Sequence, residues 1–92
     1  MGVIEIKQEA DEQWLVSIRG SVMTHHRVRI SKGDLARLGD GHSPEDLLRE
    51  SFAFLLEREP NTSILASFDL PLIGRYFPDY ETEIRSRLRR ST

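Results

Sequence analysis

The chain has 92 residues, and its 13 Lys and Arg against 15 Asp and Glu give a formal net charge of −2 at pH 7. This length supports one small hydrophobic core, so residues 1–92 are expected to form a single domain. With 38% apolar residues, 30% charged residues and only four prolines, the composition excludes a disordered chain. Because there is no cysteine, disulfide scaffolds, thiolate metal sites and cysteine nucleophiles are excluded as well.

The apolar runs of the sequence are short. The longest of them, Phe52-Ala53-Phe54-Leu55-Leu56, falls far below the ~20 residues that cross a bilayer. No secretion signal is recognisable at the N-terminus, and a chain without cysteine suits a reducing compartment. We therefore expect a cytoplasmic protein with no membrane partner.

Residues 3–30 alternate between apolar and polar side chains, which is the period of a half-buried strand. The alternation is interrupted at residues 9–12 and 20–23, and such short breaks favour hairpins. The segment is therefore predicted to form a three-stranded antiparallel meander. A hairpin closed about Asp11 collects the apolar residues on one face through the pairs Ile4–Ile18, Ile6–Val16 and Gln8–Trp14.

Two helices are predicted after the strands. A short helix covers about residues 32–38, and a long one covers Pro44–Glu59 and stops at Pro60. The start of the long helix is well marked, because the Ser43 hydroxyl can accept from the free N–H groups of the first turn. Proline suits the first helical position, and Asp46 completes a Ser-x-x-Asp capping box.

The long helix carries a wide apolar face. On a helical wheel this face spans an arc of roughly 200°, whereas one contact surface needs about 100°. It is formed by Leu47, Leu48, Ser51, Phe52, Phe54, Leu55 and Leu56. One side of the arc is expected to cover the sheet. The other side is expected to receive either the C-terminal third of the chain or a second copy, with Phe52, Phe54 and Leu56 as the candidate interface of a homodimer.

The C-terminal third is predicted to form three short helices, at about residues 62–67, 70–77 and 79–89. In the last of them an apolar side chain recurs every four residues on one face, at Tyr80, Ile84 and Leu88. The expected fold class is therefore α+β. It consists of a three-stranded antiparallel meander packed on one long helix, followed by short C-terminal helices.

The polar residues form no catalytic or metal-binding pattern. His25 and His26 are neighbours on a predicted strand, so their side chains point to opposite faces and cannot share an ion. Asp40 and His42 lie in a loop and supply fewer ligands than a zinc site uses. No serine stands in a nucleophile elbow, and no phosphate-binding glycine loop is present. We expect a non-enzymatic protein with no metal and no cofactor.

The segment from Thr24 to Glu59 joins a basic strand, Thr24-His25-His26-Arg27-Val28-Arg29-Ile30, to two helices, the second starting at Ser43-Pro44. It resembles a ribbon-helix-helix segment. The resemblance implies a DNA-binding regulator of the antitoxin kind, whose outward side chains face the nucleic acid and whose helix N-terminus holds a phosphate. In this sequence the outward positions are His25, Arg27 and Arg29.

The stretch from Phe68 to Tyr80 holds four of the seven aromatic residues of the chain. It resembles the tails of small bacterial proteins without assigned function, and this resemblance implies no functional residue. The aromatic side chains are expected to pack under the long helix.

These features lead to two hypotheses of function. The first is a protein-interaction module that self-associates or binds another protein, because the sequence has a wide apolar helix face and no catalytic constellation. The alternative is a DNA-binding regulator that uses His25, Arg27 and Arg29. The acidic balance of the chain disfavours the alternative, since no overall positive field attracts a polyanion.

Overall fold

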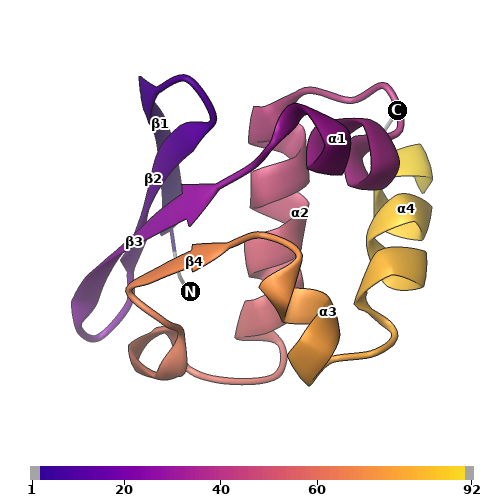
Figure 1. Ribbon diagram of the computed structural model, residues 1–92. Coiled ribbons are helices and arrows are strands. Elements are labelled where there is room, and N and C mark those ends of the chain that lie inside the picture. Colours follow the sequence, from indigo (N-terminus) through magenta and orange to yellow (C-terminus); the bar gives the residue numbers. More distant parts are fainter. Residues whose placement is uncertain (1–2, 91–92) are drawn as a thin grey trace.

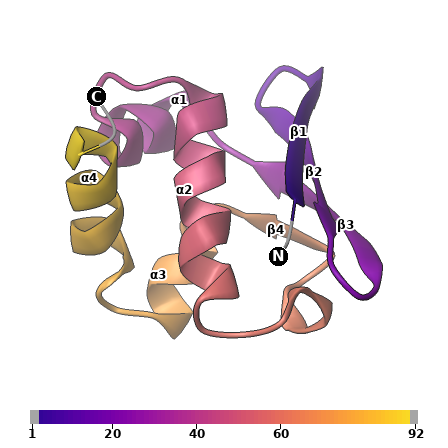
Figure 2. The same cartoon turned by 180° about the vertical axis from the view of Figure 1, so that it is seen from behind.

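The computed structural model describes residues 3–90 and contains a four-stranded sheet with its helices on one side (Figure 1; Figure 2). The expected α+β class is confirmed, although the sheet differs from the prediction. The strands are β1 (Val3–Ala10), β2 (Gln13–Arg19), β3 (Met23–Arg29) and β4 (Ser67–Asp69). The helical elements are α1 (Lys32–Asp34), the π-helical turn η1 (Leu35–Gly39), α2 (Pro44–Leu56), the 3-10 turn η2 (Asn61–Ser63), α3 (Leu72–Tyr76) and α4 (Tyr80–Arg90).

The first three strands form the predicted antiparallel meander, and its register is confirmed. β1 pairs with β2, and β2 with β3, and the first of these ladders contains the pairs Ile4–Ile18, Ile6–Val16 and Gln8–Trp14. Asp11 and Glu12 form the first turn, in which Glu12 adopts the left-handed conformation with φ 65°. Glu9 is the extra residue of a bulge, since the register shifts between Gln8 and Ala10.

The fourth strand was not predicted, and it makes the sheet mixed instead of purely antiparallel. β4 runs parallel to β3, where the Arg27 N–H donates to the Ala66 carbonyl at 2.8 Å and the Leu70 N–H donates to the Arg29 carbonyl at 3.0 Å. The helix predicted over residues 62–67 is therefore wrong, because this segment forms η2 and then extends along the free edge of β3. The helix predicted over residues 70–77 is present as the shorter α3.

The long helix α2 begins as predicted. The Ser43 side chain accepts from the Asp46 N–H at 3.1 Å, and Pro44 occupies the first turn. The helix ends at Leu56, earlier than the predicted Glu59, and a turn at residues 57–59 leads into Pro60. A proline disfavours helical angles in the residue before it, which explains why the chain leaves the helix ahead of Pro60.

Helix α2 lies between the sheet and α4, so its two apolar sides are both covered by this chain (Figure 1; Figure 2). Phe52 faces the sheet, with its ring centroid 5.7 Å from that of His26. Phe54 faces the opposite way, with its centroid 5.8 Å from Phe77 and 5.4 Å from Tyr80. The second surface is thus occupied by the C-terminal third, which was one of the two alternatives left open by the sequence.

Helix α4 closes the fold with the predicted apolar face. Its buried side chains are Tyr80, Ile84 and Leu88. The helix is also joined to η1, because Glu81 accepts from Arg37 at 2.6 Å and Arg85 donates to the backbone oxygen of Arg37 at 3.0 Å. None of the helices within residues 3–90 has the length and apolar character that crossing a bilayer requires.

Candidate functional site

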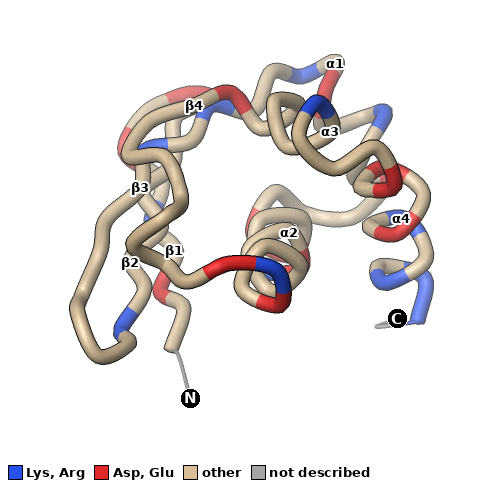
Figure 3. Tube along the Cα trace, turned by 90° about the horizontal axis from the view of Figure 1, so that it is seen from below, with Lys and Arg blue, Asp and Glu red and all other residues tan. Residues whose placement is uncertain are grey.

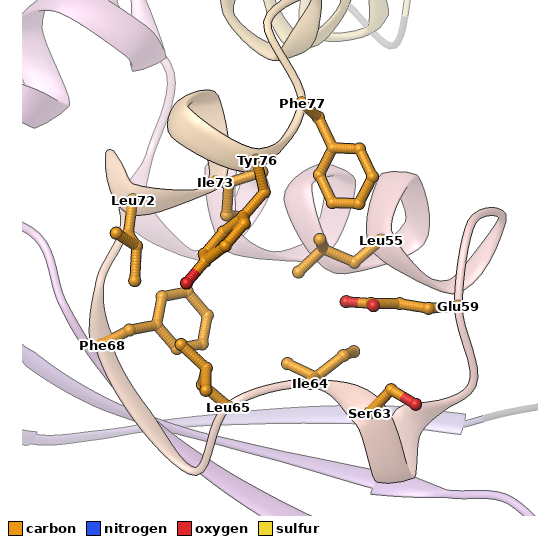
Figure 4. Close-up of a pocket in the computed structure, with 10 residues that line it drawn as sticks. All are labelled: Leu55, Glu59, Ser63, Ile64, Leu65, Phe68, Leu72, Ile73, Tyr76 and Phe77. Carbon is orange, nitrogen blue, oxygen red and sulfur yellow. The ribbon is translucent and has the colours of Figure 1, made fainter.

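An apolar hollow lies where the end of α2, the segment around residues 61–65, β4 and α3 meet (Figure 4). Its volume is about 390 Å³, within the range of about 300–1,000 Å³ that is typical of ligand pockets. The residues that line it are Leu55, Glu59, Ser63, Ile64, Leu65, Phe68, Leu72, Ile73, Tyr76 and Phe77. We refer to this feature as the apolar hollow.

The base of the hollow is buried, whereas its rim is exposed. Leu55, Ile64 and Ile73 retain only 3%, 8% and 3% of their accessible surface. Leu65 and Tyr76 stay 47% and 65% exposed, and both stand at the edge of the same hollow. In Figure 4 the Tyr76 ring extends from α3 toward the opposite wall. The rim therefore presents apolar surface that this chain leaves uncovered.

Two adjacent apolar residues form one wall of the hollow. Ile64 and Leu65 are adjacent, and Ile64 has extended backbone angles, φ −78° and ψ 137°. Both side chains line the hollow, with Ile64 8% exposed at its base and Leu65 47% exposed at its rim. This pair was the available sequence signal for the hollow, and it was not used because the segment was predicted to be helical.

Glu59 brings a carboxylate into the hollow. Its backbone N–H donates to the Leu55 carbonyl at 2.9 Å, which holds the turn after α2. Figure 4 shows the carboxylate pointing inward between the side chains of Leu55 and Ile64. Glu59 is partly buried, and within the described residues 3–90 its carboxylate has no ion pair and no hydrogen-bond donor.

The other carboxylates at this end of α2 are paired. Arg87 donates to both oxygens of Glu57 at 2.9 Å and 2.6 Å, and these hydrogen bonds lower the pKa of Glu57. Arg58 donates to Asp79 at 3.3 Å and lies 3.6 Å from the centre of the Phe54 ring. Both arginines are therefore already engaged elsewhere, away from Glu59.

A chain of hydrogen bonds anchors the wall of the hollow to the sheet. His26 is 2% exposed, and its Nδ1 donates to the Leu65 carbonyl at 2.7 Å. Because a carbonyl only accepts, the ring proton is assigned to Nδ1, and Nε2 accepts from the Thr24 hydroxyl at 2.9 Å. The Asn61 amide in turn donates to Thr24 Oγ1 and to the Val22 carbonyl, each at 2.8 Å. The segment that carries Leu65 is thus fixed against β3.

The residues predicted for DNA contact lie on the opposite side of the sheet from the helices. His25, Arg27 and Arg29 are exposed there, as the alternation of the strand predicts. His25 Nδ1 lies 2.8 Å from the Ser17 hydroxyl. β3 is paired with β2 along one edge, and β4 occupies the other edge at Arg27–Arg29, so these two arginines lie where β3 cannot form a ribbon with a second chain.

Acidic residues accompany both arginines on this open face. Arg27 lies 3.4 Å from Glu9, and Arg29 lies 3.4 Å from Glu12 and 4.0 Å from Asp69. Figure 3 shows basic and acidic positions next to one another on the sheet, while basic positions gather near the end of α4. The open face therefore has no extended positive surface.

The side chains predicted for a homodimer interface lie in the interior. Phe52 and Phe54 are both 0% exposed, and Leu56 is a partly buried residue packed against the core. The interface prediction on Phe52 and Phe54 is therefore corrected, since β4 and the C-terminal helices cover the helix face that was expected to be free. Any apolar docking surface has to be formed by other residues.

The loop between η1 and α2 brings no metal site together. His42 Nδ1 lies 2.9 Å from the Gly39 carbonyl, while its Nε2 is buried and has no partner among the described residues. Asp40 adopts the left-handed conformation with φ 47° and is exposed. Across residues 3–90, no three His, Asp or Glu side chains are grouped as metal ligands would be.

The apolar hollow combines a volume suited to a ligand, exposed apolar side chains and an unpaired carboxylate, and it is the candidate functional site. No protein-family model, no curated protein and no solved structure matches this chain, so its function has to be inferred from its own residues.

Proposed function

We propose that this is a small non-enzymatic protein whose function is to bind another protein, and that the apolar hollow receives an apolar side chain of that partner. The observation that carries the proposal is the exposure of Leu65 and Tyr76 beside a hollow of about 390 Å³. Fully burying a leucine side chain contributes about 1.5–3 kcal/mol, so covering this rim favours association.

The chemistry of the lining supports binding over catalysis. Its polar groups are the Glu59 carboxylate and the Ser63 hydroxyl, and its other lining side chains are aliphatic or aromatic, Tyr76 carrying a phenol. A serine nucleophile needs an adjacent general base, and the Ser63 hydroxyl makes no hydrogen bond to Glu59 or to any other side chain of residues 3–90. Because the chain contains no cysteine, we place this binding function in the cytoplasm, where thiols stay reduced.

The hollow is also well suited to preorganised recognition. Its lower wall is held by the hydrogen bond from His26 to Leu65, and the Phe77 ring is held against Phe54. Because this wall is already held in place, little of the chain becomes ordered when a partner binds. The entropy cost of association is reduced accordingly.

The proposal is tested by selecting displayed random dodecapeptides against the purified protein. The selected peptides are then titrated into the wild type, Leu65→Ser, Tyr76→Ser and Val3→Ser. Val3 is the matched control, since it is 53% exposed but lies on β1, at the far edge of the sheet from β4.

We expect the selected peptides to contain a large apolar residue and to bind Leu65→Ser and Tyr76→Ser about tenfold more weakly than wild type, a loss of about 1.4 kcal/mol. Val3→Ser should bind like the wild type. Equal binding to all four proteins would show that the hollow is not the docking site.

A further inference from the structure

The Glu59 carboxylate indicates which kind of segment the hollow accepts. We infer that the partner segment carries a lysine or arginine next to the apolar residue that enters the hollow, and that Glu59 pairs with this cation. The inference rests on the proposed function, and it adds the charge of the partner.

The Glu59 carboxylate depends on solvent in the free protein. Glu59 is partly buried between Leu55 and Ile64, and no donor of residues 3–90 contacts it. Within the part of the chain that the structure describes, only solvent is left to hydrate this group. A segment that fills the hollow displaces that water, and a desolvated carboxylate is unfavourable unless a new donor or cation replaces it. A purely apolar segment would leave Glu59 uncompensated.

The arginines of this chain that lie near Glu59 are not available to pair with it. Of the arginines nearby in the sequence and fold, Arg58 is paired with Asp79, and Arg87 holds both oxygens of Glu57. Moving either of them to Glu59 would break an existing ion pair. Arg75 is exposed on α3, but it does not line the hollow and forms no ion pair with Glu59, so the cation that compensates Glu59 on binding is one that the partner brings.

The remaining walls of the hollow suit a lysine or arginine side chain. Phe68, Tyr76 and Phe77 contribute aromatic rings to the lining, and aromatic faces attract ammonium and guanidinium groups. The methylene stem of a lysine or arginine can lie along aliphatic side chains while its charged end reaches a carboxylate. The hollow offers both surfaces, whereas an acidic segment would face repulsion from Glu59.

The experiment uses the tightest dodecapeptide from the selection in three synthetic forms. They carry the selected basic residue, glutamine or glutamate at the position beside the apolar anchor. Each form is titrated by calorimetry into the wild type, Glu59→Gln, Glu59→Lys and Glu5→Gln. Glu5→Gln is the control, because it removes the same charge from an exposed position on β1. Thermal unfolding of each variant checks that it is folded.

With the wild type and with Glu5→Gln, we expect the basic peptide to bind about tenfold more tightly than the glutamine peptide, as for a charge-assisted hydrogen bond. With Glu59→Gln this preference should fall below about twofold, as expected when one charge of a pair is removed. Glu59→Lys should reverse it and favour the glutamate peptide.

The outcomes separate the inference from the proposed function. If the selected peptides contain no basic residue, or if Glu59→Gln keeps the wild-type preference, the inference about Glu59 is wrong while docking in the hollow stands. If no peptide depends on Leu65 and Tyr76, the proposed function fails and the inference fails with it.

Discussion

His26 donates from Nδ1 to the backbone oxygen of Leu65 at 2.7 Å, and this bond joins the buried face of the sheet to the rim of the apolar hollow. The two residues lie far apart in the chain, on β3 and just ahead of β4. The Leu65 backbone is thereby fixed while its side chain stays 47% exposed. The position of the rim therefore depends on β3 as well as on the segment between η2 and β4.

The substitution His26→Phe is expected to destabilise the protein by about 1–3 kcal/mol, because it removes the hydrogen bonds that the buried His26 ring makes with the Leu65 carbonyl and the Thr24 hydroxyl. The phenyl ring would keep the contact with Phe52 but could not bond Leu65 or Thr24. Urea unfolding measures the loss. The comparison is His25→Phe on the open face, which loses one hydrogen bond to Ser17, so we expect a smaller change, below about 1 kcal/mol. Equal losses in the two variants would contradict the anchoring role of His26.

Ser51 and Tyr80 form a buried hydrogen bond of 2.7 Å between α2 and α4. Tyr80→Phe removes one partner, so it should lower the free energy of unfolding by about 1–3 kcal/mol, and Ser51→Ala should act similarly. The double variant should lose less than the sum of the two single losses, because it leaves no unpaired hydroxyl. Additive losses in a double-mutant cycle would mean that the bond contributes no coupling.

Alkaline pH provides a separate test of the burial of Tyr80. Burial raises the pKa of this phenol, and the hydrogen bond from Ser51 offsets only part of that effect. Below the ordinary value of about 10, the folded and unfolded chains both keep the proton, so the contribution of Tyr80 is fully present. Above a pH of about 10 the unfolded chain loses its Tyr80 proton first, and the free energy of unfolding should fall as the pH rises.

Urea midpoints of Tyr80→Phe should therefore decline less steeply with pH than those of the wild type, and Tyr76→Phe should follow the wild type. Parallel declines in all three proteins would contradict the raised pKa.

The DNA-binding alternative has a direct measurement of its own. Because Glu9, Glu12 and Asp69 lie beside Arg27 and Arg29, we expect no binding of random-sequence duplex DNA at low salt. Non-specific DNA-binding proteins reach dissociation constants of about 10⁻⁴ to 10⁻⁶ M at physiological salt, so titration to ~100 μM protein would reveal such binding. Binding that weakens steeply with salt and is lost in an Arg27→Ala, Arg29→Ala variant would favour the DNA-binding function instead.

Much of the fold could be predicted because its signals are long or chemically specific. The alternation over residues 3–30 is sustained enough to define three strands and to select the pairing of Ile4 with Ile18. Ser43 and Pro44 mark the start of α2 through their own chemistry. The face of Tyr80, Ile84 and Leu88 follows from the helical period.

The fourth strand could not be predicted because it depends on a partner instead of on its own sequence. β4 has three residues, and only Phe68 faces the core, so no alternation can be recognised. Its hydrogen bonds exist because β3 has a free edge at this place, which is a property of the tertiary structure.

The hollow was missed for a related reason. Its lining comes from four elements, and each apolar residue taken alone has the character of a core residue. The exposure of Leu65 and Tyr76 depends on the position of α3 relative to the end of α2. A local sequence pattern does not determine this tertiary arrangement. The sequence predicts the wide apolar arc of α2. The width of this arc does not indicate whether α4 or a second copy of the chain covers Phe54, and in the structure α4 does.

The docking role of the hollow is tested most directly by amide chemical-shift mapping of the isotope-labelled protein during titration with a selected dodecapeptide. Docking in the hollow predicts shifts concentrated at residues 55–59, 63–68 and 72–77, with the open face of β1 and β2 unchanged and with the shifts lost in Tyr76→Ser. Shifts centred on His25, Arg27 and Arg29, or shifts that persist unchanged in Tyr76→Ser, would contradict it.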